Sequence, residues 1–489
     1  MSKILLINPN KWGRGITHIW IASHSAKLKS DGHDVSLFDC TFYKNWTDNE
    51  TLFNTYNAMY KPSEYEMKIK FSEEDIYESL QKKIDDFDPD FIFWSGLSSH
   101  IHGEGEYVNI QYGCNLIEKI TTKAIKICGG LQATANPELV LRKLKSIDYL
   151  ISGESELVLS ELVRELPARE LKSKGVSYIK ENKFISTPKQ DLISNMDEIP
   201  KYDYSLFDKQ VFLRPYNGEV INAVDYELSR GCMFACHYCV ETIIQKYYGF
   251  NEVNKRGSIS NHKAYLRNKS AKRIFDELNS LVNEYNVKLI RSQDTNFLTI
   301  NKNVLSELAE LIETNNLQFK MYIETRPEGI NSKSVELLKK LNVDGVGMGI
   351  ELSTQSFRED KLRRFADTEK IINAFKLLKE YNINRTAYNI IGLPDQDEDS
   401  IIETIEFNRL LKPDNVTVAY YSPYLGTERQ IRGQELGDFD EYEFNVDSTF
   451  RSHTKNKSLN TSCLNYYKEN FSKFSNNNLP IIKYSEQHS

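Results

Sequence analysis

Short apolar runs alternate with amphipathic stretches in two separate parts of the chain, and this alternation constrains the fold more than any other feature. In the first part, the apolar runs predict strands at 3–8, 34–38, 91–95, 124–128 and 148–151. A helix is predicted at 19–30, and another after the last of these strands. Strands that alternate with helices indicate a parallel sheet with helices on both faces. We therefore predict an N-terminal α/β domain built on a doubly wound parallel sheet.

The alternation resumes near residue 225 and continues to about 430. Strands are predicted at 225–228, 288–292, 318–323, 345–349, 385–391 and 415–421, with helices in the gaps between them. Six strand–helix repeats predict a (β/α)6 partial TIM barrel, with the chemistry at the carboxyl ends of its strands. The predicted parts are an α/β domain at 1–165, a linker at 166–220, a barrel at 221–430 and a C-terminal extension at 431–489. We expect substrate contacts from the extension, whereas an insertion at about 42–85 has no predicted role.

Composition narrows the class of protein. The 489 residues carry a net charge of −7, which gives no overall basic field for nucleic acid. No apolar run is long enough to span a membrane, and the run at 4–7 has the length of a buried strand and not of a signal peptide. We therefore expect a cytoplasmic protein with neither a membrane nor a nucleic acid as partner.

Three of the seven cysteines are crowded into eight positions, as Cys232, Cys236 and Cys239. Three thiolates on one loop can bind three irons of a [4Fe–4S] cluster and leave the fourth iron open. The amino and carboxyl groups of S-adenosylmethionine can bind that open iron, and reduction of the cluster would then yield a 5′-deoxyadenosyl radical. The other four cysteines are scattered and are expected to be ordinary thiols.

Zinc is the main alternative for this cysteine run. A structural zinc site normally takes four ligands, often as two C-x-x-C pairs, and the sequence has no second pair. His237 lies between two of the cysteines, a position that strains tetrahedral geometry around one ion. The iron–sulfur interpretation is therefore favoured.

The run 232–239, with the aromatic Tyr238 before its last cysteine, resembles the motif of the radical S-adenosylmethionine superfamily. The resemblance extends over most of residues 225–430. It implies that Glu351 binds the ribose hydroxyls of S-adenosylmethionine, that the segment 392–394 lies beside the adenine, and that a cation at 363–364 meets the methionyl carboxylate. The implied cofactor contacts are Tyr238, Arg326, Glu351, Ser353, Arg363, Arg364, Gly392 and Leu393.

Each of these assignments has a plainer alternative. Glu351 could be a solvated acid at the end of a strand, and 392–394 could be a simple turn. Arg363 and Arg364 could be surface residues of a helix. The polar segment 293–296 occupies the place of a loop that faces substrate or cofactor in related enzymes.

Residues 1–165 resemble the flavodoxin- or Rossmann-like cobalamin-binding domain that precedes the radical domain in one large subfamily. The matching segments are 7–9, 95–99, 129–133 and 153–156, which all end predicted strands. Ligands of doubly wound sheets bind at such carboxyl ends, where glycines let the backbone approach a flat macrocycle. The implied cobalamin contacts are Asn8, Ser98, Ser99, Gly129, Gly130, Gln132, Gly153 and Glu154.

One departure from the corrinoid pattern concerns the cobalt ligand. Corrinoid methyltransferases place Asp-x-His-x-x-Gly after the first strand, whereas this chain has Asn8, Asn10 and Gly13 at the three positions. We therefore predict base-off cobalamin with no protein histidine on its lower face. His100 and His102 lie near the same sheet edge, and a hydrogen-bonding role is favoured for both. The structural alternative is an α/β domain that binds no corrin.

Together the two parts resemble the cobalamin-dependent (class B) radical S-adenosylmethionine methyltransferases. The resemblance implies methylation of an unactivated carbon, less often phosphorus, in a small-molecule substrate. It also implies an electron donor such as flavodoxin or ferredoxin. An enzyme with the same cofactors that catalyses rearrangement, ring contraction or cyclisation is one alternative, and a non-catalytic cobalamin-binding protein is another. The acidic charge and the lack of a further cysteine trio disfavour methylthiotransferases acting on transfer RNA.

Overall fold

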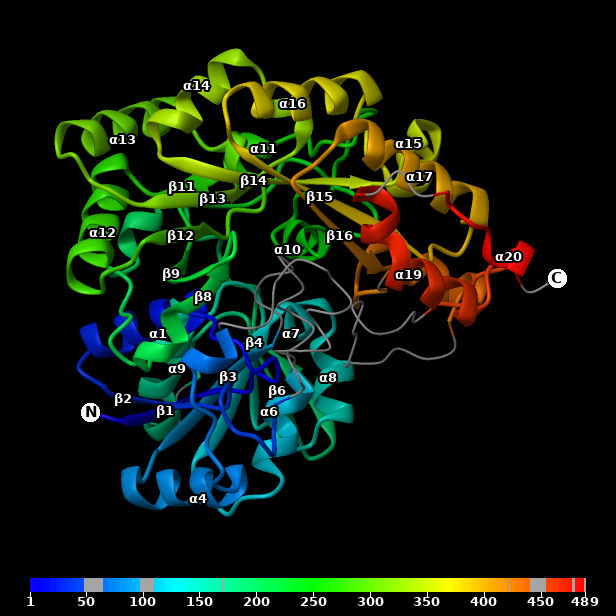
Figure 1. The fold of residues 1–489 in the computed structure, drawn as a ribbon. Helices are drawn as coiled ribbons and strands as arrows, with labels where there is room; N and C mark the ends of the chain where they lie inside the picture. The colour runs from blue at the N-terminus through cyan, green and yellow to red at the C-terminus, as the bar shows by residue number, and fades with distance from the viewer. Residues whose placement is uncertain are drawn as a thin grey trace. The chain divides into compact units, whose positions relative to one another are not determined.

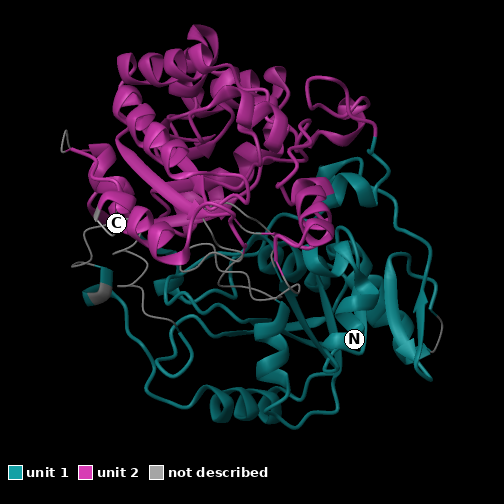
Figure 2. Ribbon diagram, turned by 90° about the vertical axis from the view of Figure 1, so that its right-hand side faces the viewer, with its two compact units in different colours: residues 1–50, 65–214, 243–251 teal, residues 51–64, 215–242, 252–489 magenta. Residues whose placement is uncertain are grey.

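The computed structural model describes residues 1–47, 65–96, 110–168, 171–421, 423–439, 454–476 and 480–487 (Figure 1). The chain divides into two compact units (Figure 2). Unit 1 contains the described residues within 1–50, 65–214 and 243–251. Unit 2 contains those within 215–242 and 252–489. Among the described helices, none combines the length and the apolar character that crossing a bilayer would need.

Unit 1 is built on a seven-stranded sheet with the order β2-β1-β3-β4-β5-β6-β7. The strands are β1 (Lys3–Asn8), β2 (Asp34–Asp39), β3 (Phe91–Gly96), β4 (Ile125–Gly130), β5 (Tyr149–Ile151), β6 (Val176–Lys180) and β7 (Lys183–Ser186). The first five are parallel, and β6 and β7 are antiparallel additions. Every residue of β3 is buried, as expected for a parallel strand covered on both faces. The strand order reverses between β1 and β3, the place where such sheets bind ligands.

Helices accompany these strands. They are α1 (Ile19–Ser30), α3 (Tyr65–Lys68), α4 (Ile76–Phe87), α6 (Ile110–Ile117), α7 (Leu131–Ala135), α8 (Pro137–Lys143) and α9 (Glu156–Ala168). α1 and α9 pack against each other. The residues expected as a linker include the hairpin β6–β7, which extends the sheet of unit 1. Of the predicted insertion, residues 48–64 lie outside the described part of the chain.

A second seven-stranded sheet has the order β16-β15-β14-β13-β12-β9-β8. Its strands are β8 (Leu213–Tyr216), β9 (Glu219–Tyr226), β12 (Leu289–Ser292), β13 (Lys320–Glu324), β14 (Val343–Glu351), β15 (Asn384–Ile391) and β16 (Asn415–Tyr420). The six strands from β9 to β16 pair in parallel and form a curled half-barrel. β8 and β9 are joined by Asn217 and Gly218, both with positive φ as in a type I′ turn. The predicted fold class is confirmed for both sheets.

Five helices cover this sheet between its parallel strands, and polar N-caps start them. The helices are α12 (Ala271–Glu284), α13 (Lys302–Thr314), α14 (Ser332–Lys340), α16 (Thr368–Glu380) and α17 (Glu398–Leu411). Their caps, whose side chains accept hydrogen bonds from backbone amides, are Ser270, Asn301, Asn331, Asp367 and Asp397. Shorter elements are β10 (Ser229–Arg230), α10 (Glu241–Tyr247), α11 (His262–Tyr265), β11 (Arg267–Asn268) and α15 (Gln355–Leu362).

The C-terminal extension contributes α18 (Glu428–Leu436), α19 (Thr461–Asn476) and α20 (Tyr484–Gln487). α19 packs against α17 and the edge strand β16 through a buried cluster that includes Phe471 and Val418. Lys468 is buried, donates a hydrogen bond to the carbonyl of Val418 and lies 5.5 Å from the ring centre of Tyr420. Sheet edges left open invite pairing with other chains. The extension therefore covers an edge of the half-barrel.

Replacing Phe471 by Ala should lower the free energy of unfolding by about 3–5 kcal/mol, because the ring is fully buried and its removal leaves a cavity. Urea denaturation followed by circular dichroism measures the change. Glu469→Ala on the exposed side of the same helix serves as control and should change stability by less than about 0.5 kcal/mol. Equal effects of the two substitutions would show that α19 does not depend on this cluster.

Candidate active site

The cysteine run forms a loop between β10 and α10. None of Cys232, Cys236 and Cys239 forms a disulfide, and the first two are buried. Gly231 precedes the loop with a φ of 96°, and a Cβ there would lie 2.9 Å from the carbonyl oxygen of Tyr265. Only glycine fits such a position without strain. The chain therefore enters the cysteine loop through a tight turn that requires glycine at 231.

The chemistry of the three thiols fits an iron–sulfur cluster. Burial raises the pKa of each thiol, to about 12 for Cys239, so metal binding must displace the protons. In the part of the chain that the structure describes, no three His, Cys, Asp or Glu side chains surround a single ion position. A zinc site requires such convergence, whereas cysteines of a cluster each bind a different iron. The donor set therefore fits a cluster better than zinc.

A buried polar network supports the loop from below. Lys269 is fully buried, and its ammonium group lies 3.0 Å from Glu277, which also accepts a 2.5 Å hydrogen bond from the hydroxyl of Tyr226. Burial alone would raise the pKa of Glu277, but Lys269 and Arg273 more than offset this and lower it to about 2. The backbone amide of Lys269 donates to Leu228. The network therefore fixes the chain where β9 leads into the cysteine loop.

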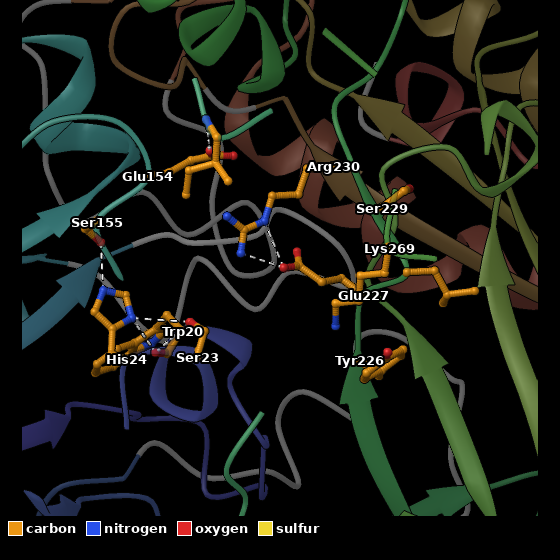
Figure 3. Close-up of polar contacts among 12 residues, drawn as sticks. Trp20, Ser23, His24, Glu154, Ser155, Tyr226, Glu227, Ser229, Arg230 and Lys269 are labelled. Carbon is orange, nitrogen blue, oxygen red and sulfur yellow. Dashed lines mark hydrogen bonds and ion pairs between the residues drawn. The ribbon is translucent and has the colours of Figure 1, made fainter. Parts of the chain in front are cut away.

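Figure 3 shows the neighbouring pair Glu227 and Arg230, whose carboxylate and guanidinium lie 2.7 Å apart. Asp294 holds the same region from the next strand. Its carboxylate accepts hydrogen bonds from the amides of Leu228 and Ser229 at 3.2 and 2.6 Å. Asp294 is 1% exposed. Asp294, within the segment 293–296, therefore fixes the backbone of Leu228 and Ser229 just after β9.

Glu351, Tyr238 and Arg364 come together at the end of β14. Glu351 accepts a 2.8 Å hydrogen bond from the hydroxyl of Tyr238, and its carboxylate lies 3.5 Å from Arg364. Glu351 has a φ of 64°, a left-handed conformation that costs a residue with a Cβ about 1–2 kcal/mol. Such strain is concentrated at functional sites. A Cβ on Gly349 would lie 2.3 Å from the Glu351 carboxylate, so this residue must be glycine.

The two neighbouring arginines have different surroundings. Arg364 is buried and donates a hydrogen bond to the carbonyl of Gly349, beside Glu351. Arg363 is partly exposed and pairs with Glu428 of α18 at 2.9 Å. Arg364 therefore belongs to the buried group at the end of β14. Arg363 instead links the end of α15 to α18.

Three further residues expected near S-adenosylmethionine follow the ends of β14 and β15. The amide of Ser353 donates to Thr404 at 3.1 Å, and Gly392 has a φ of 80°. Leu393 is buried in an apolar cluster with Leu352. The turn at 392–396 is held by the extension, because Thr454 donates to the carbonyl of Gly392 at 2.8 Å and Asn456 donates to that of Gln396 at 2.9 Å. No sequence motif indicated these two bracing residues.

Tyrosines fill the sheet above a row of glycines on β14. The hydroxyl groups of Tyr322 and Tyr388 lie 2.9 Å apart, and Tyr388 donates a 2.9 Å hydrogen bond to Glu324. A Cβ on Gly347 would lie 2.6 Å from the ring of Tyr388. The alternate glycines of β14 are the sequence signal from which this arrangement could have been predicted.

In unit 1 the predicted cobalamin contacts lie along the carboxyl edge of the sheet. The side chain of Asn8 donates to Asp39 at 3.0 Å, and Gln132 accepts a 3.3 Å hydrogen bond from Ile110. Gly130 has a φ of 106°, and a Cβ there would lie 1.9 Å from the carbonyl oxygen of Gly96. Two further members, Gly153 and Glu154, use their amides to donate to Thr134 and Tyr248. Ser98, Ser99, His100 and His102 lie outside the described residues.

Asn10 occupies the position of the missing histidine ligand. It is fully buried, and its amide oxygen accepts a 2.8 Å hydrogen bond from the amide of Trp12. Its NH2 group donates to the carbonyl of Arg14 and the hydroxyl of Thr41, both at 2.9 Å. Asn10 is therefore a structural residue of the loop after β1.

A buried histidine lies behind the glycine pair of β4. In Figure 3, His24 is turned toward Ser155, and the two side chains are 2.9 Å apart. The other ring nitrogen of His24 lies 2.5 Å from the carbonyl oxygen of Trp20, and the imidazole stacks on Phe93 with centres 4.9 Å apart. A Cβ on Gly129 would lie 3.4 Å from the hydroxyl of Ser155. Nothing in the sequence distinguished His24 from an ordinary helix residue.

Comparisons with known proteins concern the domain that contains the cysteine loop and the fold of the chain. Residues 226–407 match the model of the radical SAM superfamily, whose members use S-adenosylmethionine and a [4Fe–4S] cluster. The chain is 28% identical over 378 residues to an uncharacterised methyltransferase of Pyrococcus horikoshii, and the match covers 76% of each protein. It is 24% identical over 381 residues to the anaerobic magnesium-protoporphyrin IX monomethyl ester cyclase of Cereibacter sphaeroides. That match covers 75% of this chain but 57% of the cyclase.

Two solved structures share the fold over most of the chain. The radical S-adenosylmethionine methyltransferase TsrM from Kitasatospora setae, with cobalamin and a [4Fe–4S] cluster bound, has a TM-score of 0.65 at 15% identity. That match covers 90% of this chain and 80% of TsrM. The cobalamin-dependent enzyme OxsB, with aqua-cobalamin and S-adenosylmethionine bound, has a TM-score of 0.64 at 15% identity. It covers 97% of this chain and 66% of OxsB. Residues 226–407 therefore form a radical S-adenosylmethionine domain, and the chain shares its fold with the cobalamin-dependent enzymes TsrM and OxsB.

Proposed function

We propose that the protein is a cobalamin-dependent radical S-adenosylmethionine methyltransferase that methylates an unactivated carbon, less often a phosphorus, of a small molecule. The observation that carries the proposal is the loop of three free thiols at the carboxyl end of the half-barrel. The similarity to a methyltransferase over 76% of its length supports methyl transfer. One TsrM structure contains tryptophan as substrate, which supports a small-molecule acceptor.

The proposed cofactor contacts follow from the positions of the side chains. Cys232, Cys236 and Cys239 would hold the cluster, which supplies the electron that cleaves S-adenosylmethionine. Glu351 would accept hydrogen bonds from the ribose hydroxyls, and Arg364 would orient the Glu351 carboxylate. The segment 392–394 would lie beside the adenine, fixed in place by Leu393, which packs in an apolar cluster with Leu352. An external donor such as a flavodoxin or ferredoxin would supply the electrons.

In unit 1 we propose that the carboxyl edge of the sheet holds cobalamin, which would carry the methyl group to be transferred. Gly130 and Gly153 lie at this edge with φ values of 106° and 86°, which glycine adopts without strain. Because the amide of Asn10 is occupied by Trp12, Arg14 and Thr41, we propose that this residue offers no cobalt ligand. The cobalamin is therefore proposed to be base-off, without a protein histidine on its lower face.

A cyclase reaction is the second candidate, because the chain is also similar to an anaerobic cyclase over 75% of its length. Both reactions would use the same cluster loop and the same contacts to S-adenosylmethionine. They differ in the products, since methylation consumes a second S-adenosylmethionine as methyl donor and cyclisation does not.

Replacing Cys232, Cys236 or Cys239 by Ala should abolish the iron–sulfur absorbance and the formation of 5′-deoxyadenosine, because a methyl side chain cannot bind iron. Iron analysis and chromatography of anaerobically purified protein provide the measurement. Replacing Cys114 or Cys463 by Ala is the matched control and should leave both signals intact, because these cysteines lie apart from the loop. A Cys236→Ala protein that still forms 5′-deoxyadenosine at the normal rate would refute the assignment of the cluster.

Replacing Glu351 by Gln should weaken S-adenosylmethionine binding by about 1–3 kcal/mol, the usual loss for a charge-assisted hydrogen bond. Isothermal titration of the protein with its cluster measures the dissociation constant, and the iron content should stay unchanged. Glu369→Gln on the exposed face of α16 is the control and should have no effect. An unaltered dissociation constant for Glu351→Gln would remove Glu351 from the cofactor site.

The reaction itself makes a stoichiometric prediction. Methylation of an unactivated carbon requires hydrogen abstraction first, so each product should be accompanied by one 5′-deoxyadenosine and one S-adenosylhomocysteine. Deuterium on the acceptor carbon should appear in 5′-deoxyadenosine. Cell extract incubated anaerobically with methyl-labelled S-adenosylmethionine, followed by mass spectrometry, identifies the product. Product formed without S-adenosylhomocysteine and with an unchanged carbon count would favour the cyclase instead.

A further inference from the structure

Arg326 contacts the cysteine loop directly. One of its guanidinium nitrogens donates to the sulfur of Cys236 at 3.6 Å. The guanidinium carbon lies 3.7 Å from the ring centre of Phe234, which stands within the loop between the first two cysteines. The side chain is 7% exposed. The planar guanidinium thus stacks on Phe234 and donates a hydrogen bond to Cys236.

Several contacts fix Arg326 in this position. Glu328 accepts hydrogen bonds from two other guanidinium nitrogens, at 3.1 and 2.5 Å. The backbone amide of Arg326 donates to Asn296 at 3.3 Å, and Asn296 also accepts a 2.8 Å hydrogen bond from Thr325. Because Glu328 binds two guanidinium nitrogens and Phe234 stacks on the guanidinium plane, the third nitrogen is held in a fixed direction toward the sulfur of Cys236.

Charge decides what this contact does. A cluster held by three thiolates becomes more negative by one unit when an external donor reduces it. A cation beside one of the sulfurs therefore stabilises the reduced form, and hydrogen bonds to cluster sulfurs shift the reduction potential in the same direction. Glu328 places a negative charge on the far side of the guanidinium and reduces this effect.

We propose that Arg326 is a positioning residue for the cluster, with its guanidinium held by Glu328 and directed at Cys236 to make the cluster easier to reduce. The proposal rests on the proposed function only in that Cys236 binds the cluster. This role differs from binding the methionyl carboxylate of S-adenosylmethionine, which is the role expected for a cation at 363–364. Arg364, beside Glu351 and Gly349, remains for that task.

Two substitutions of opposite sign test the proposal. Arg326→Gln removes the positive charge and should lower the reduction equilibrium constant of the cluster about tenfold, which is about 59 mV for a one-electron couple. Glu328→Gln removes the opposing negative charge and should shift the potential in the positive direction. Arg326→Lys keeps the charge and should lie nearer the unchanged protein than Arg326→Gln. The potential is measured by anaerobic redox titration, followed through the electron paramagnetic resonance signal of the reduced cluster.

The control is Arg385→Gln. Arg385 is also a buried arginine, paired with Asp414 at 2.8 Å, but it lies at the amino end of β15. Its loss should leave the potential unchanged. Equal potentials in all variants, or shifts of the same sign for Arg326→Gln and Glu328→Gln, would overturn the proposal. So would loss of iron from both of these variants, because Arg326 would then only build the loop. If the protein without substitutions contained no cluster, that result would instead refute the proposed function.

Discussion

The cysteine loop depends on a buried ion pair beneath it. Lys269 and Glu277 are almost completely excluded from solvent, where an unpaired charge would cost several kcal/mol. Glu277 is also bonded to Tyr226 and Arg273, so both charges are matched. Lys269 in turn holds the backbone of Leu228. Because this network joins β9 to α12, it anchors the backbone that leads into the cysteine loop.

The arrangement above the sheet reflects an exchange of volume between neighbouring strands. β14 has glycine at 345, 347 and 349, and larger side chains from the neighbouring strands and from the end of β14 itself occupy the space. Tyr322 and Tyr388 lie over the first two glycines, and the carboxylate of Glu351 lies over the third. The hydroxyl and carboxylate groups of these side chains are then hydrogen-bonded to one another or to Tyr238. The glycines of β14 thus leave space for the side chains of Tyr322, Tyr388 and Glu351.

The fold class and the cysteine loop could be predicted from the sequence, because both follow from local spacing. Strand periodicity appears within a few residues, and 232–239 contains all three cysteines. The contact between Arg326 and Cys236 joins residues 90 positions apart, and no local pattern reports it. Thr454 and Asn456 lie in a stretch whose composition resembles a disordered tail. For Asn10 the departure from the corrinoid pattern was visible, but its burial and its three hydrogen bonds depend on Thr41 and Trp12.

The bracing of the turn at 392–396 has a consequence for the order in which the protein matures. Thr454 reaches back 62 positions to the carbonyl of Gly392, and Asn456 reaches back 60 to Gln396. During synthesis the strands of the half-barrel leave the ribosome well before these residues do. The turn that precedes α17 is therefore braced only once residues 454–456 have been made, later than every strand of the half-barrel.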